Sequence, residues 1–133
     1  MLDNRKMKKD KIIYWTVTGI IALMMSFSVY AYLTQESVSL GFRHLGFPGY
    51  FRIELAIAKF LGIVVLVVPQ IPSRIKEWAY AGFAITFISA NIAHINSGDP
   101  MAKAMMPIIA LVILVISYIY LHKIKTVAPV NAK

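Results

Sequence analysis

The sequence contains no cysteine, and charged residues are scarce. Without cysteine the chain has no disulfides, no thiol redox chemistry and no thiolate metal ligands. Asp, Glu, Lys and Arg make up 15% of its 133 residues, whereas soluble domains carry about 25%. Hydrophobic residues make up 59%, which is more apolar surface than the core of a small soluble domain can bury. The excess predicts contact with lipid.

Acidic residues are the scarcer of the two charged classes. Six Asp and Glu stand against 14 Lys and Arg, so the formal net charge is +8. A basic protein can bind nucleic acid through a basic face on a soluble fold. Here the Lys and Arg lie beside or between apolar runs, so the charge indicates membrane orientation and we expect no nucleic-acid partner.

Four apolar segments are long enough to cross a bilayer, which takes about 17–25 helical residues. Proline and glycine fall in the stretches that separate the segments. The first segment is too long for a signal-peptide core and lacks a small-residue cleavage site, so we expect it to be retained. The sequence therefore predicts an all-α fold, a single transmembrane domain over residues 1–133 that forms an antiparallel four-helix bundle in contact with the lipid bilayer. Its helices are expected at approximately 12–33, 50–68, 78–95 and 104–121.

The positions of Lys and Arg predict the orientation of this bundle. Cytoplasmic connections are enriched in these residues. With the N-terminus in the cytoplasm, the outer side carries only Arg43, Arg52 and Lys103. The inner side carries many more: Arg5, Lys6, Lys8, Lys9, Lys11, Arg74, Lys76, Lys123, Lys125 and Lys133. Both termini are therefore expected in the cytoplasm.

Small residues recur at helical spacing in the second and third segments. Ala58 and Gly62 are four residues apart, and Gly82, Thr86 and Ala90 form a similar series. In lipid, small residues let helix backbones approach closely. We therefore expect both series to lie at helix contacts in a compact bundle.

Polar side chains inside the predicted spans form the candidate site. Such groups are costly at membrane depth and need a partner or water. Glu54, Lys59, Asn91 and His94 are all expected in the outer half of the bundle, with Lys59 deepest. Glu54 and Lys59 are about 140° apart around an ideal helix, so the expected partner of Glu54 is His94 on the next span. The loops above add His44 and Asp99.

Two interpretations of this polar cluster remain open. A carboxylate, an imidazole and an ammonium can form a proton-accepting or ligand-binding pocket by shifting one another's pKa values. The same groups can instead form a polar clasp that fixes which helix faces which, with Lys59 reaching along its helix toward the outer interface. No metal site is predicted, because a metal needs three or four ligands and only His44 and His94 form a histidine pair on one side.

Most of the chain after Phe42 resembles the DoxX-like family of small bacterial membrane proteins. The longest matching run is IKEWAYAGF, from Ile75 to Phe83. Shorter runs share the resemblance: LGFPGYF at 45–51, AKFLG at 58–62, ANIAH at 90–94, SGDP at 97–100, Pro69 and Pro107. The resemblance implies a four-helix bundle in the bacterial inner membrane. It assigns no catalytic residue, and the catalytic residues of this chain, if any, are unknown.

The resemblance and the small size favour a non-catalytic subunit or assembly factor of a membrane complex over an enzyme. Such a protein would use its helix faces to hold a membrane-protein partner or a second copy of itself, and its outer polar pocket to stabilise the bundle or hold a small ligand. No cofactor is predicted. Related DoxX and DoxD proteins are linked to quinone-coupled sulfur oxidation, so one alternative is a quinone-linked oxidoreductase component with a quinone near His94 or Lys59 and Glu54 as proton donor. Another alternative is a small transporter whose polar groups line a path.

Overall fold

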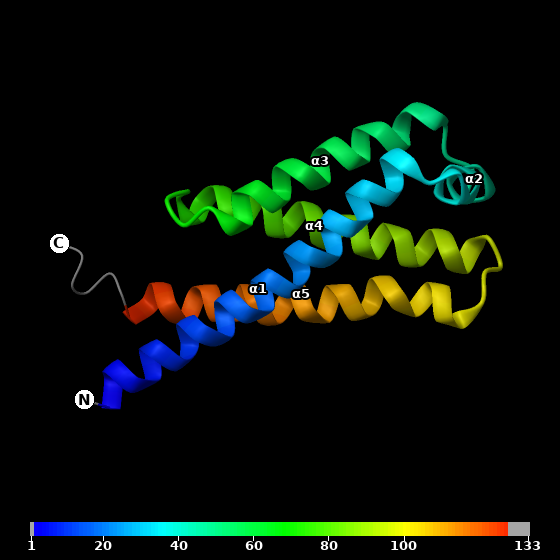
Figure 1. Cartoon of the computed structure of the whole chain (residues 1–133). Helices are drawn as coiled ribbons and strands as arrows, with labels where there is room; N and C mark the ends of the chain where they lie inside the picture. The colour runs from blue at the N-terminus through cyan, green and yellow to red at the C-terminus, as the bar shows by residue number, and fades with distance from the viewer. Residues whose placement is uncertain (1, 128–133) are drawn as a thin grey trace.

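The computed structural model describes residues 2–127. Four long helices lie side by side, and a short helix covers one end of the bundle (Figure 1). Among these residues there is no strand, so the expected all-α antiparallel bundle is confirmed. The start of the first helix and the end of the last lie at the same end. In chain order the helices are α1 (Leu2–Thr34), α2 (Glu36–His44), α3 (Gly49–Val67), α4 (Ser73–Asn96) and α5 (Met101–Val127).

The spatial order of the helices differs from their order in the chain. The α1 helix packs closely against both α3 and α5, and α4 packs closely against α5. Although α3 and α4 are consecutive, their contact is much sparser. One side of the bundle is therefore more open than the others. We call the end covered by α2 the α2 end, and the opposite end, where α1 begins and α5 finishes, the terminal end.

Three helices are long and apolar enough to cross a membrane, over Arg5–Thr34, Ser73–Asn96 and Met101–Ile124. The chain is therefore a multi-span membrane protein. The α3 helix is not among the three, and it carries Arg52, Glu54 and Lys59 within 19 residues. However, α1 and α4 both run from the terminal end to the α2 end, so α3 returns the chain between them (Figure 1). Its 19 residues span about 28 Å, close to the thickness of a hydrocarbon core. The fourth crossing stays a prediction that this arrangement supports.

Apolar side chains cover the outside of the bundle as well as its core. Leu23 and Trp78 are each 74% exposed, and Phe27 is 67% exposed, as expected for helices that face lipid. The core is a continuous cluster of buried side chains from the four long helices: Tyr14, Ile21, Met25, Leu66, Tyr80, Phe83, Phe87, Ala110, Leu114 and Leu121.

Several helix boundaries differ from the sequence-based expectation. The α1 helix begins at Leu2 rather than near residue 12, so the basic N-terminal stretch is helical. The α2 helix lies in a stretch expected to be a loop, and it buries Phe42. The α4 helix begins at Ser73, directly after Pro72. Lys76 is therefore a buried helical residue, only 4% exposed, and not the loop charge that the orientation count assumed. Lys133, also in that count, lies outside the described residues.

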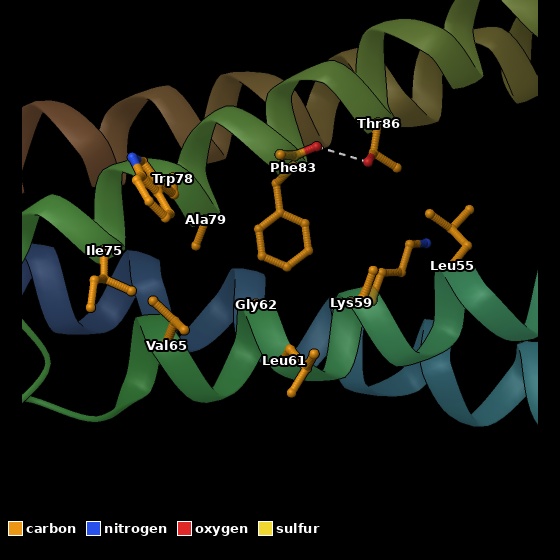
Figure 2. A pocket seen from close by; sticks show the side chains of 12 residues that line it. Leu55, Lys59, Leu61, Gly62, Val65, Ile75, Trp78, Ala79, Phe83 and Thr86 are labelled. Atoms are coloured by element: carbon orange, nitrogen blue, oxygen red, sulfur yellow. Dashed lines mark hydrogen bonds between the residues drawn. The ribbon is translucent and has the colours of Figure 1, made fainter.

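The two series of small residues have different roles. A Cβ atom at Gly62 would lie 2.6 Å from Cζ of Phe83, so this glycine allows α3 and α4 to approach at the Phe83 ring, as Figure 2 shows. A Cβ atom at Gly82 would meet nothing within 4 Å. The expectation that the Gly82 series lies at a close helix contact is wrong at Gly82, because α4 faces open space there.

Candidate functional site

A cavity of about 640 Å³ occupies the α2 end of the bundle. All five helices contribute to its wall, which is mainly apolar. Its polar and charged lining residues include four of the six site residues expected from the sequence: His44, Lys59, His94 and Asp99. The volume lies within the range of about 300–1,000 Å³ typical of small-molecule sites.

Lys59 lies at the wall of this cavity and is only 6% exposed. Its Nζ atom donates to the Ser28 hydroxyl at 2.8 Å and to the Tyr32 hydroxyl at 2.9 Å, both on α1. The same Nζ lies 4.1 Å from the centre of the Tyr32 ring, a cation–π contact. The side chain leans toward Leu55, in the direction of the start of α3 (Figure 2). These contacts with α1 hold it inside the bundle.

Glu54 is not part of this arrangement. Its side chain is exposed, and within the described residues it forms no ion pair or hydrogen bond. The expected pairing of Glu54 with His94 is therefore wrong. Lys59 faces α1, and the separation of about 140° between the two positions turns Glu54 away from the cavity.

Asp99 is instead the partner of both histidines at the α2 end. Its Oδ1 atom lies 2.9 Å from Nε2 of His44, and its Oδ2 atom lies 2.7 Å from Nδ1 of His94. The Asp99 side chain is 8% exposed, against 24% for His94 and 55% for His44. Both carboxylate oxygens are thus occupied, and they connect α2 to the end of α4.

Two glycine turns bring these three side chains together. Gly98 has φ +73°, a left-handed conformation that glycine adopts without strain. Its N–H donates to the carbonyl of Ile95, and the N–H of Asp99 donates to the carbonyl of His94, which is the Schellman pattern of helix termination. Asp99 is thereby folded back over His94. Gly46, with φ +88°, ends α2 in the same way after His44.

The charge state of Asp99 follows from its two partners. The hydrogen bond from His94, followed by that from His44, holds the pKa of the Asp99 carboxyl below its usual range. Asp99 is therefore ionised at neutral pH and accepts both imidazole N–H groups. This arrangement can bind two elements together, and a carboxylate with a lowered pKa is a weak base.

Asn91 and Arg52 have structural contacts. The Asn91 side-chain amide donates to the carbonyl of Ala104 at 2.7 Å, which joins α4 to the first turns of α5. Arg52 donates to the carbonyl of Tyr32 in the last turn of α1, where a cation complements the helix dipole. The four residues Glu54, Lys59, Asn91 and His94 therefore do not form one cluster.

A second opening, of about 340 Å³, lies between α3 and α4 on the open side of the bundle (Figure 2). Phe83 points into it from α4 toward Gly62, and Trp78 lies along its upper edge in this view. Leu55, Lys59 and Thr86 line both this groove and the cavity. The groove and the cavity therefore meet at Lys59.

A buried polar network that was not expected from the sequence lies nearer the terminal end. The Ser117 hydroxyl is hydrogen-bonded to the Thr18 and Tyr80 hydroxyls, each at 2.6 Å, and links α5 to α1 and α4. Beside it Lys76 donates to the carbonyl of Leu66 at 3.1 Å and to the Tyr14 hydroxyl at 3.5 Å. The spacing of these residues indicates the network in the sequence. Tyr14 is four residues from Thr18, and Lys76 is four residues from Tyr80, so each pair shares a helix face.

No group of three or more His, Asp or Glu side chains is placed to hold a metal ion within the part of the chain whose placement is described. In comparison with known proteins, the family model described as DoxX-like matches residues 16–117. No curated protein and no solved structure matches the chain significantly.

Proposed function

Because the chain belongs to the DoxX-like family, whose model matches it over most of its length, we propose that it is a non-catalytic subunit or assembly factor of a membrane complex. In this proposal the cavity at the α2 end holds a small, largely apolar molecule. The protein resides in the bacterial inner membrane with both termini in the cytoplasm, as the distribution of Lys and Arg favours.

The observation that carries the ligand-binding part is the cavity itself. An apolar wall with few polar groups, within the size range of small-molecule sites, is the usual form of a binding pocket. The contacts of those polar groups favour binding over catalysis. Lys59 is held by two hydroxyls, and each oxygen of Asp99 is hydrogen-bonded to a histidine.

A quinone-linked role is the second candidate, because Lys59 and His94 both line the cavity and both can donate to a carbonyl oxygen. Glu54 cannot serve as the proton donor of such a site, since its exposed side chain is not part of the cavity wall. For the same reason Glu54 does not line a transport path through the cavity.

Native mass spectrometry of the protein released gently from its own membrane tests the proposal. We expect the chain to carry an additional small molecule, a partner polypeptide or both. A quinone-sized mass would favour the second candidate. A bare chain in repeated preparations would contradict the proposal.

A pair of substitutions on α4 locates any small molecule that is found. Ala93 lines the cavity, so Ala93→Phe should fill part of it and remove the added mass. Ala81 is exposed on the same helix and lines neither opening, so Ala81→Phe should retain that mass. Retention in both variants would place the molecule outside the cavity.

A further inference from the structure

Lys59 is a buried ammonium group without a carboxylate partner. Its side chain is 6% exposed, yet no carboxylate of the described residues lies within 4 Å of its Nζ atom. Groups of this kind are costly at membrane depth and are normally paired with an opposite charge. The two hydroxyls and the Tyr32 ring stabilise the cation but do not neutralise it.

The amino group also retains hydrogen-bonding capacity. An ammonium group has three N–H donors, and two of them are accepted by Ser28 and Tyr32. The third has no acceptor among the described side chains. In Figure 2 the amino group of Lys59 projects into the space between α3 and α4, where the groove and the cavity meet. An anion at this junction would find both a charge and a donor.

The depth of Lys59 restricts the kind of anion. It lies ten residues after Gly49, the first residue of α3, or about 15 Å along the helix. A bilayer phospholipid keeps its large phosphate head group at the interface, because desolvating such a group is expensive. A long-chain carboxylic acid can instead reach this depth in its protonated, neutral form, which avoids the cost of desolvating a charge, and the positive charge of Lys59 then favours its ionised form. One chain also suits a cavity of about 640 Å³.

We propose that the cavity binds a long-chain carboxylic acid, with its carboxylate on Lys59 and its apolar chain in the cavity at the α2 end. The groove between α3 and α4 gives the acid lateral access from the bilayer, since its wall is mostly apolar and it joins the cavity at Leu55, Lys59 and Thr86. This inference rests on the proposed function, because it names the class of molecule that the cavity holds.

The test compares two probes of equal chain length on the unaltered, full-length protein in a neutral detergent. Native mass spectrometry titrations measure the dissociation constants of hexadecanoic acid and of hexadecan-1-ol. The alcohol has the same chain but no negative charge. We expect the acid to bind at least tenfold more tightly than the alcohol.

Two lysine variants assign the difference to Lys59. Lys59→Met should bind the acid and the alcohol with equal affinity, while its unchanged affinity for the alcohol shows that the cavity is intact. Lys76→Met is the matched control, because Lys76 is equally buried but lines neither the cavity nor the groove. It should retain the tenfold preference. If Lys59→Met does not fold, the comparison of the two probes on the unaltered protein still tests whether the carboxylate contributes to binding.

Each other outcome overturns the inference in a distinct way. Equal binding of acid and alcohol removes the role of the carboxylate but leaves the apolar binding cavity of the proposed function. Tighter binding of hexadecanoyl lysophosphatidylglycerol than of the acid replaces the carboxylate by a phosphate head group. If neither probe binds and the protein from its own membrane also carries no small molecule, the ligand-binding part of the proposed function fails as well.

Discussion

The hydroxyl network around Ser117 offers a test of how the bundle is held together. Ser117 and Thr18 are fully buried, and Tyr80 is 3% exposed. Replacing Ser117 with alanine removes a hydroxyl that is hydrogen-bonded to both, each at 2.6 Å. Two buried hydroxyls on α1 and α4 then lose their shared partner on α5.

The expected cost follows from measurements on other membrane proteins. Hydrogen bonds between membrane helices contribute about 0.6 kcal/mol on average and up to about 1.7 kcal/mol, and an unsatisfied buried group adds to the loss. With two bonds removed, Ser117→Ala should destabilise the protein by about 1–3 kcal/mol. Ser26→Ala is the control, because Ser26 is exposed on α1, and it should change stability by less than about 0.5 kcal/mol.

Reversible unfolding in mixed micelles, followed by circular dichroism, measures these differences. The double variant Ser117→Ala/Tyr80→Phe completes the cycle. Because both single changes break the same hydrogen bond, the double variant should be less destabilised than the sum of the single variants, by about 0.6–1.7 kcal/mol. Additive effects, or a Ser117→Ala variant as stable as Ser26→Ala, would show that the network does not hold the three helices together.

Three further predictions concern other parts of the bundle. Gly62→Ala should destabilise the protein by about 1–3 kcal/mol, because its Cβ would overlap the Phe83 ring. Gly82→Ala should stabilise it by about 0.5–1 kcal/mol, because a Cβ there meets nothing and alanine favours the helix. Equal thermal stability of the two variants would refute the close approach at Gly62. Asp99→Asn should be destabilising at neutral pH, and the difference in stability between the two proteins should vanish as the pH falls. The folded-state pKa of Asp99 is lowered. Its contribution to stability is therefore present above the ordinary pKa near 3.9 and is lost as the pH passes through the lower folded-state pKa. Melting curves of both proteins from pH 7 to pH 2 measure this, and a gap that stays constant below pH 4 would contradict it. Finally, Ser73→Cys and Ser97→Cys, each introduced into the cysteine-free chain, should react oppositely with an impermeant thiol reagent in intact cells; labelling of Ser73→Cys from outside would reverse the predicted orientation.

The sequence by itself determined the class and general architecture of the protein. Apolar runs as long as a bilayer is thick have few stable alternatives to helices, because backbone polar groups in lipid must be satisfied within the segment. The apolar pattern did not indicate α2, whose nine residues are too short to span a membrane and do not form a long apolar run. Lys76 was expected in a loop, because a positive charge near the end of an apolar run is typical of a connection, whereas α4 begins three residues before Lys76.

Only the tertiary structure decided which polar groups meet. Glu54 and His94 were both expected near one end of the bundle, but the pairing of two side chains depends on how each helix is rotated about its axis, and the apolar pattern does not specify this rotation. Lys59 faces α1 and lies between two hydroxyls, while Glu54 on the same helix is exposed. Asp99 reaches His94 because Gly98 reverses the chain at the end of α4. The ionisable residues were visible in the sequence, but their partners depend on helix rotation and on this one turn.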